Sequence, residues 1–197
     1  MNKSLIWAGV VAAVLGLLLV WGIGSYNNLV KLDQSVQTQW AQVENVYQRR
    51  ADLIPNLVAT VKGAAAHERE TLEAVTEARA KVGQVEMTAP YDDPEAMARF
   101  EAAQGQLSSA LSRLMVVVEQ YPQLQANQNF LSLQSQLEGT ENRITVERMR
   151  FNEAAQAYNT KRETFPTSMV ANMFGKFETK AYFHSQAGAE NAPKVEF

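Results

Sequence analysis

The chain has 197 residues and a net charge of -3, is 46% hydrophobic and 20% charged, and contains no cysteine and two histidines. This composition is typical of one folded domain with room for one additional segment. The acidic balance excludes a protein whose main task is to grip nucleic-acid phosphates, which needs concentrated lysine and arginine. Without cysteine there is no disulfide framework, thiolate zinc site or cysteine nucleophile.

The first segment, residues 5–23, consists only of apolar residues and glycine. As a helix it would be about 28 Å long, close to the thickness of a hydrocarbon core. Trp7 near one end, and Trp21 with Tyr26 near the other, match the aromatic belts of membrane interfaces. We therefore predict a transmembrane anchor within residues 1–26. The alternative is a cleaved signal peptide, whose apolar stretch usually has only about 7 to 15 residues.

Few basic residues mark the two sides of this segment. Lys3 and the N-terminus precede it, and Lys31 is the nearest base after it. By the positive-inside rule, this small excess places the N-terminus in the cytoplasm and the bulk of the chain outside. We expect a single-pass protein of the bacterial inner membrane.

A long amphipathic helix is predicted over residues 28–82. From Val36 to Val82, seam positions recur in alternating steps of four and three, the pattern of a helix that packs lengthwise against others. Pro55 lies inside the pattern and predicts a kink between a membrane-proximal stalk and a bundle-forming half. At roughly 80 Å, this helix is longer than its predicted partners, so we expect part of it to be a stalk or an oligomer contact.

Three further helices are predicted from apolar spacing and end signals, over residues 94–120, 127–163 and 167–174. Residues 176–197 lose the periodicity and are expected to form a loosely structured tail. Aromatic residues of this tail, including Phe177 and Phe197, are expected to dock onto the bundle or a neighbouring subunit. The predicted fold is all-α: an N-terminal transmembrane helix, then an elongated antiparallel bundle of three long helices and a short C-terminal helix, over residues 27–175.

The short helix 167–174 has two interpretations. It is apolar on one side and could lie on a membrane surface. Surface helices usually carry a lysine-rich polar face, which this segment lacks. We therefore expect it to pack in the core or against another subunit.

Known catalytic and metal-binding patterns do not match. His67 opens the string His-Glu-Arg-Glu, but a zincin needs a second histidine where Thr71 stands. A carboxylate-bridged di-iron bundle needs a glutamate three residues before each histidine, where this chain has Ala64 and Ala181. The chain also has no G-x-S-x-G and no phosphate-loop pattern. We predict no catalytic, cofactor-binding or metal-binding residue.

Polar residues at or beside the seams are candidates for contacts that fix the register between helices. Glu138 and Glu141 lie one turn apart, but paired acids need a cleft that shifts their pKa values, so a solvated charged face is the preferred interpretation. The register candidates are Arg49, Arg50, Asp52, Pro55, His67, Glu68, Glu141 and Arg148.

Several stretches of the chain resemble the LemA family. They are SYNNLVKLDQSV, QRRADLIPNLVATVKGAAAHE, YPQLQANQNFLSLQSQLEGTENRI, RMRFNEAAQAYN and TFPTSMVANMFG. The resemblance implies a single-pass membrane protein with a helical bundle outside the bilayer, and it supplies no established reaction, cofactor or catalytic residue. Family members are associated with membrane-bound zinc metalloproteases of envelope quality control, and a magnetosome branch is implicated in shaping membrane.

Three functions are compatible with these features. The first is a non-enzymatic membrane-anchored scaffold that self-associates and organises or curves the bilayer. The second is an adaptor that presents the bundle to a membrane protease or another envelope protein. The third, a hydrolase or metalloenzyme, is disfavoured by the failed motifs. The expected partners are membrane lipid, further copies of the chain and, for the adaptor, a membrane-bound metalloprotease, but not nucleic acid.

Overall fold

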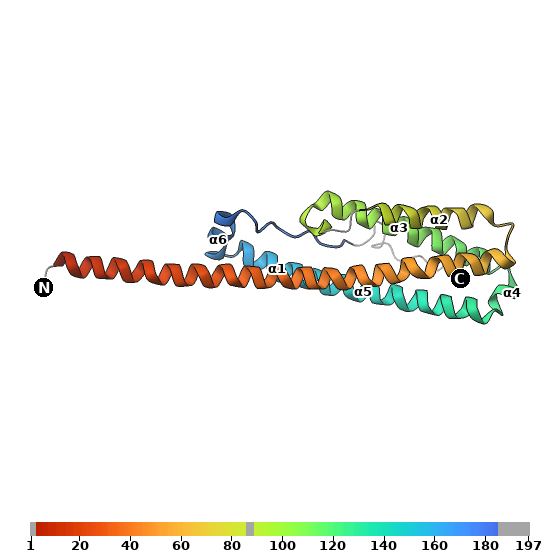
Figure 1. The fold of residues 1–197 in the computed structure, drawn as a ribbon, viewed down its shortest axis with the longest axis horizontal. Helices are drawn as coiled ribbons and strands as arrows, with labels where there is room; N and C mark the ends of the chain where they lie inside the picture. The colour runs from red at the N-terminus through yellow and green to blue at the C-terminus, as the bar shows by residue number, and fades with distance from the viewer. Residues whose placement is uncertain (1–2, 86–88, 185–197) are drawn as a thin grey trace, which may run out of the picture.

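The structure, a computed structural model, describes residues 3–85 and 89–184; Phe197 and the end of the tail lie outside them. Within the described residues the fold is all-α, as predicted, and Figure 1 shows an elongated bundle from which the start of α1 projects alone. The elements are α1 (Lys3–Ala64), α2 (Arg69–Gln84), the 3-10 helix η1 (Pro90–Asp92), α3 (Pro94–Val118), α4 (Pro122–Gln125), α5 (Gln128–Glu163) and α6 (Thr167–Phe174).

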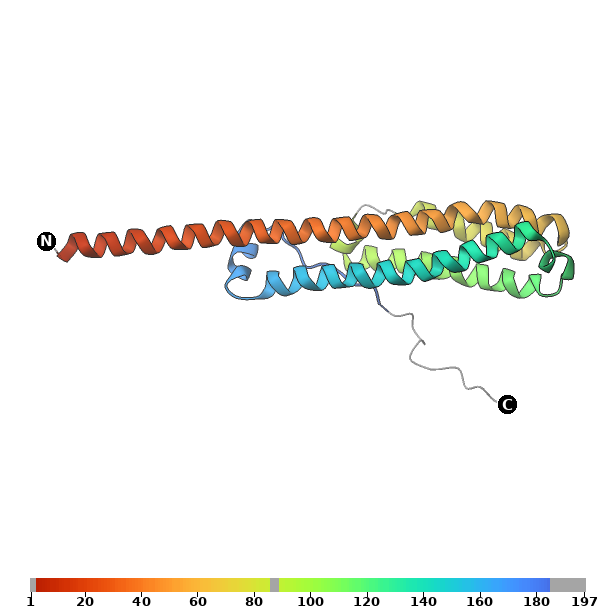
Figure 2. The ribbon, with the colours of Figure 1, turned by 90° about the horizontal axis from the view of Figure 1, so that it is seen from below.

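Helix α1 joins the projecting apolar segment to the bundle without interruption (Figure 2). None of residues 5–23 is buried, and the first buried residues of α1 are Ser25 and Leu29. The apolar part of α1 is long and apolar enough to cross a membrane. The apolar segment and the bundle helix that follows it are therefore one helix of 62 residues.

The predicted single helix over residues 28–82 is wrong, because the chain turns back at residues 65–68 and continues as α2. Ala65, fully buried, accepts a backbone hydrogen bond from Glu68 at 3.1 Å and closes the turn. The turn was hidden because alanine favours a helix and a single glycine such as Gly63 is tolerated in one. The part of α1 within the bundle, residues 25–64, is about 60 Å long and is matched by α5 at about 54 Å. The excess length that suggested an oligomer contact does not exist.

Two pairs of helices form the half of the bundle far from the apolar segment, with α2 packed on α3 and α1 on α5. The start of α3 is as predicted: Asp93 caps the helix by accepting a hydrogen bond from the Glu95 amide at 2.9 Å, and Pro94 is the first helical residue. The apolar core between the pairs includes Leu57, Val61, Val75, Leu107 and Leu114.

The half of the bundle near the apolar segment is closed by residues 176–184, which we call the strap. These residues follow α6, run along α1 and α5, and end against the first turns of α3 (Figure 1). Phe177 and Phe183 are 3% and 6% exposed, and the Phe183 ring stacks on Trp40 at 5.9 Å between centroids. The prediction of a loosely structured tail is therefore wrong for residues 176–184, although the docking of its aromatic residues onto the bundle is confirmed there.

Pro55 lies within α1, which continues past it. Side chains of α1 are buried in the bundle from Ser25 onward, so the predicted joint between a stalk and a bundle-forming half is not at this residue. Pro55 stands instead where two core clusters meet, one ending on α1 at Tyr47 and the other beginning at Ile54. Only Arg50 is buried on α1 between these two residues.

Candidate functional site

The buried polar residues of the bundle gather around Arg50, midway along α1. Arg50 occupies a seam position between Tyr47 and Ile54, so the helix turns it inward, and it is 2% exposed. Its Nη1 donates hydrogen bonds to Ser108 Oγ at 3.0 Å and to Glu141 Oε1 at 2.6 Å, and its Nη2 donates to Gln104 Oε1. Because these partners lie on α3 and α5, one side chain connects three helices.

A second arginine, Arg148 on α5, joins the bundle to the strap. Its Nη2 donates to Glu101 Oε1 at 3.0 Å and to the carbonyl oxygen of His184 at 2.7 Å. Glu101 also accepts a hydrogen bond from the His184 amide at 3.0 Å, and the guanidinium of Arg148 lies 4.6 Å from the centroid of the Phe183 ring. Arg148 thus holds the end of the strap against α3 and α5.

Between the two arginines lies a pocket of about 500 Å³, which we call the polar pocket. It is lined by Tyr47, Arg50, Glu101, Gln104, Glu141 and Arg148, among others. Each arginine is paired with one of the two glutamates, so their formal charges balance. Burial raises the pKa of Tyr47, although the positive charges of Arg148 and Arg50 oppose the rise, so this phenol stays protonated at neutral pH. Two buried pocket atoms, Arg50 Nε and Gln104 Nε2, have no hydrogen-bond partner among the described residues. Both are donors, and Tyr47 lacks the lowered pKa of an activated nucleophile.

A second polar cluster surrounds Lys180 of the strap and is called the lysine clamp. The side chain of Lys180 is 6% exposed, and its Nζ lies 2.8 Å from Asp33 Oδ1 and 2.7 Å from Asp92 Oδ1. Nζ also lies 5.3 and 5.1 Å from the ring centroids of Tyr91 and Tyr158. The clamp therefore ties the strap to α1 and to η1 through a paired, buried cation.

Two asparagines of α5 hold the strap backbone. Asn159 accepts a hydrogen bond from the Lys180 amide at 2.8 Å and donates to the Lys180 carbonyl at 2.9 Å. Asn152 does the same for Phe183, at 2.9 and 3.0 Å. Since the two asparagines are two helical turns apart, they fix the strap at two points along α5.

We expect Tyr158→Phe to flatten the loss of stability at alkaline pH. The Tyr158 hydroxyl is buried with no hydrogen-bond partner among the described residues, and burial raises its pKa to about 12. An unfolded chain releases this proton near pH 10.0, so the folded state loses stability as the pH rises from there through about 12. The Tyr158→Phe variant lacks this loss, and its stability at neutral pH is nearly unchanged. Chemical denaturation at neutral pH and in the alkaline range measures both effects.

Tyr182→Phe is the control. The Tyr182 hydroxyl accepts a hydrogen bond from Asn159 at 2.9 Å, so the Tyr182→Phe variant should lose stability at neutral pH. An unchanged alkaline slope in Tyr158→Phe would contradict the prediction.

A model of the LemA family matches residues 39–197. The chain belongs to the LemA family. This LemA chain is 27% identical over 182 residues to magnetosome protein MamQ of Magnetospirillum gryphiswaldense, a match that covers 84% of the chain and 66% of that relative. Magnetosome protein MamQ 2 of Paramagnetospirillum magneticum matches to the same extent, 27% over 84% of the chain and 66% of the relative. Protein LemA of Metamycoplasma hominis is 23% identical over 166 residues, covering 83% of the chain and 71% of the relative.

The chain spans 66% of the length of the MamQ relatives, just under two thirds. The family match begins within α1, after the apolar segment, and includes every residue that lines the polar pocket. Of the lysine clamp, it includes Asp92 and Lys180 but not Asp33.

The structure brings together three of the eight register candidates of this LemA chain, since Arg50, Glu141 and Arg148 all line the polar pocket. Arg49 and Asp52 are exposed on α1, where Asp52 accepts a hydrogen bond from Gln48 at 2.8 Å. The structure thus gives them no contact between helices.

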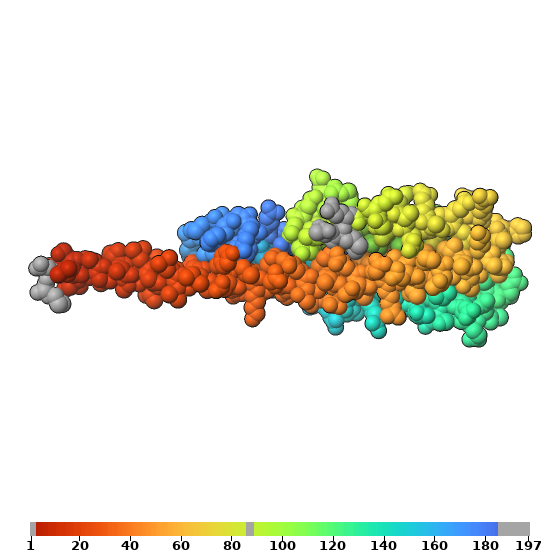
Figure 3. All heavy atoms as spheres, in the orientation of Figure 1, coloured from red at the N-terminus to blue at the C-terminus, as the bar shows by residue number. Residues whose placement is uncertain are grey.

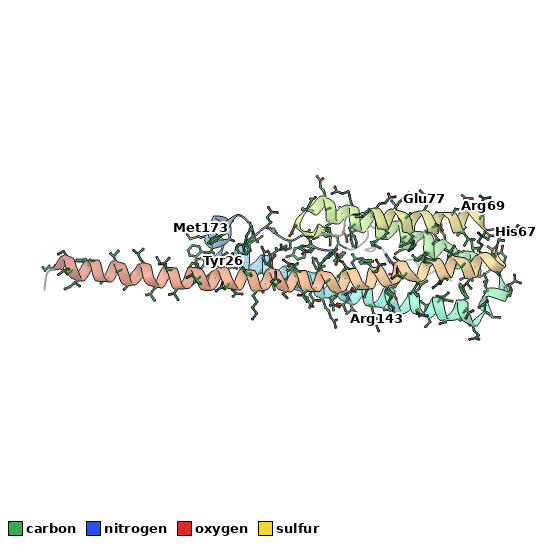
Figure 4. The ribbon with its side chains drawn as sticks, viewed as in Figure 1. Tyr26, His67, Arg69, Glu77, Arg143 and Met173 are labelled. Atoms are coloured by element: carbon green, nitrogen blue, oxygen red, sulfur yellow. The ribbon has the colours of Figure 1, made fainter. Side chains whose placement is uncertain are left out.

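The other candidates lie elsewhere in the bundle. His67 is exposed in the turn between α1 and α2, at the end of the bundle opposite the apolar segment (Figure 4). Glu68 accepts a hydrogen bond from the Tyr121 hydroxyl at 2.9 Å and so connects this turn to the start of α4. Within residues 3–85 and 89–184, no group of three or more histidine, aspartate or glutamate side chains is placed to hold a metal ion.

Several residues of the two polar clusters were not predicted. Gln104 had a usable signal, because it stands in the apolar seam of α3 between Phe100 and Leu107, as Arg50 does on α1. Asn152 and Asn159 are spaced seven residues apart on the same helix face, which also indicates a shared contact. Lys180 had no signal, because the strap has neither helical nor strand periodicity.

Proposed function

We propose that this chain is a non-enzymatic membrane-anchored scaffold that self-associates and organises or shapes the surrounding envelope membrane. The observation that carries the proposal is the continuity of α1, which supplies both the apolar segment and the central helix of the bundle. An unbroken helix transmits the orientation of the anchor to the bundle. Neighbouring copies therefore present their bundles in a fixed direction relative to the membrane, as an organising scaffold requires.

The polar pocket supports the non-enzymatic part of the proposal. Its arginines are paired with glutamates, and the pKa of Tyr47 is raised by burial rather than lowered. Catalytic groups usually combine a perturbed pKa with a free reacting atom in a cleft. Here the polar atoms serve to connect α1, α3, α5 and the strap.

Self-association is supported by the apolar segment of α1. Ala8, Ala12 and Gly16 recur every four residues on one face, and all three are exposed. Small residues at this spacing let two membrane helices approach closely, because the backbones can touch. A Cβ added at Gly16 would meet nothing within 4 Å, so this face is free of contacts within the chain.

The relatives are consistent with an organising role. Two of them are named magnetosome proteins, and each aligns with 84% of this chain. The part of the chain that matches the family comprises the bundle and the strap, the rigid portion of the proposed scaffold.

Gly16→Leu is expected to weaken self-association severalfold, because a leucine side chain at this position keeps the two helix backbones from approaching closely. The measurement is single-molecule photobleaching of labelled full-length protein in lipid vesicles, over a range of protein-to-lipid ratios. Val14→Phe is the control, since at 100° per residue it lies on the opposite face of α1. Wild-type protein that stays monomeric at every ratio would overturn the scaffold. Unchanged association in Gly16→Leu would overturn only the assignment of this face.

An adaptor for a membrane-bound metalloprotease or another envelope protein is the second candidate function. It is favoured by Val146 and Met149, which are exposed by 40% and 55% on α5. The two side chains lie about one helical turn apart and offer a small apolar contact to a partner protein. Photo-crosslinking from position 149 in native membranes that captures only further copies of this chain would contradict the adaptor.

A further inference from the structure

Helix α6 lies at the end of the bundle nearest the apolar segment of α1 (Figure 3), and α6 and Phe165 just before it expose large apolar side chains. The side of α6 that is buried against the bundle carries Thr167, Val170 and Ala171. The exposed residues are Phe165 at 75%, Met169 at 61%, Met173 at 77% and Phe174 at 54%, and we call these four the apolar foot. A soluble surface rarely gathers four such side chains without a partner.

The position of the apolar foot along the axis of α1 is set by its contact with Tyr26. The Tyr26 ring packs edge-on against Phe174 at 4.9 Å and against Phe177 at 5.5 Å between centroids. Tyr26 follows the last residue of the apolar segment, Ile23, by about 4.5 Å along the helix. The headgroup layer on each side of a hydrocarbon core is about 5 to 7 Å thick. If residues 5–23 cross the bilayer, α6 therefore lies at the level of this layer.

Figure 4 shows Met173 at the membrane-facing end of the bundle, beside Tyr26. Among the described residues, α1 alone extends further toward the N-terminus than the segment around α6 in Figures 1 and 2. The apolar foot is thus continuous with the surface that the membrane anchor presents to lipid.

A basic residue stands beside the apolar foot. Lys176 is exposed, its Nζ donates a hydrogen bond to the Tyr26 hydroxyl at 2.6 Å, and Nζ lies 4.6 Å from the centroid of the same ring. Tyrosine and lysine together are typical of membrane interfaces, where the ring sits among headgroups and the ammonium reaches lipid phosphate. Lys176 supplies the positive charge that the sequence of α6 lacks.

We propose that the apolar foot inserts into the lipid headgroup layer of the leaflet from which α1 emerges. This deepens the proposed function and rests on its membrane anchor. With α1 as one attachment and α6 as the second, the bundle cannot rotate about the anchor or tilt freely, and each copy adds apolar volume to one leaflet only. Insertion of this kind on one side of a bilayer favours curvature.

The test measures where the apolar foot lies in full-length protein reconstituted into vesicles of phosphatidylcholine and phosphatidylglycerol. Because the chain has no cysteine, single variants Met173→Cys, Val116→Cys and Leu15→Cys can each carry one nitroxide label. Val116 is a matched exposed apolar residue, 60% accessible, at the end of α3 far from the apolar segment. Leu15 lies within the segment and reports whether the anchor is inserted. Accessibility to oxygen, which enters lipid, is compared with accessibility to a water-soluble nickel chelate.

We expect the label at position 173 to show a ratio of oxygen to nickel accessibility between that of position 15, near the middle of the apolar segment, and that of position 116, which remains accessible to nickel. If the label at position 173 is accessible to nickel while the label at position 15 is in lipid, the insertion of the apolar foot is contradicted but the membrane anchor is not. An aqueous label at 15 would overturn the anchor and, with it, the foot. A label at 173 that neither reagent reaches would mean that protein, such as a second copy, covers α6, and would also overturn the proposal.

Discussion

Arg50→Ala is expected to destabilise the bundle by about 3 kcal/mol, through a cavity and the loss of a buried ion pair. Arg50 is 2% exposed and its guanidinium is the hydrogen-bond donor to Gln104, Ser108 and Glu141. Glu141 is 45% exposed and keeps contact with water, so the cost stays below that of a fully enclosed pair. Chemical denaturation of the full-length protein in detergent, followed by circular dichroism, measures the effect.

Arg49→Ala is the matched control for this substitution. Arg49 is the neighbouring arginine on α1, but it is exposed, and surface changes of this kind usually shift stability by no more than about 0.5 kcal/mol. The double variant Arg50→Ala with Glu141→Gln separates the pair from the cavity, because it removes the charge that Arg50 leaves behind. Equal effects of the two arginine substitutions would show that the polar pocket does not hold the helices together.

The contrast between Arg49 and Arg50 also shows what periodicity predicts. The seam of α1 placed Arg50 inward from spacing alone, and its partner Glu141 and the second pocket arginine, Arg148, were named from the polar side of the helix over residues 127–163. Spacing does not say which residue of another helix will lie opposite. Gln104 becomes a partner of Arg50, and Glu101 a partner of Arg148, only through the way α3 is aligned with α1 and α5. This alignment depends on the positions of the intervening turns.

The sequence patterns did not predict the turn at residues 65–68 or the strap, and the physical reasons differ. The segment from Gly63 to His67 has no strong helix breaker, so its local preference favours a continuous helix and tertiary packing decides the turn. The strap forms no regular element and is held instead by Asn152, Asn159 and the lysine clamp. Local patterns predict elements with internal hydrogen bonds, whereas the strap's contacts come from other parts of the chain.

These strap contacts cover a core that would otherwise face water. The aromatic cluster around Trp40 includes Phe100 and Phe151, at 5.3 and 5.5 Å between ring centroids, and Phe183 completes it from the strap. Aromatic pairs of this geometry add about 0.5 to 1.5 kcal/mol each beyond burial. The same strap continues directly from α6, so a firm strap also fixes the apolar foot relative to the bundle.

Lys180→Met is expected to release the strap and to cost about 3 kcal/mol, because the carboxylates of Asp33 and Asp92 lose their common cation. Limited proteolysis should then cleave within residues 176–184, while Lys31→Met, an exposed lysine on α1, should leave cleavage and stability unchanged. Asp92→Asn in the Lys180→Met background should restore part of the stability by removing one of the two facing charges. A Lys180→Met strap that resists protease as well as wild type would contradict the clamp.

The clamp also predicts a direction for the pH dependence of stability. Burial tends to lower the pKa of Lys180, but the hydrogen bonds to Asp33 and Asp92 outweigh it and raise the pKa above its ordinary value of 10.5. A folded-state pKa above the unfolded value means that the clamp's contribution is complete below pH 10.5 and is lost as the pH rises through the folded-state value. Lys180→Met lacks that contribution at every pH, so its stability should converge on that of wild type in strong alkali. Deprotonation of Tyr158 lowers the stability of the folded state over the same pH range, so the comparison is made in the Tyr158→Phe background.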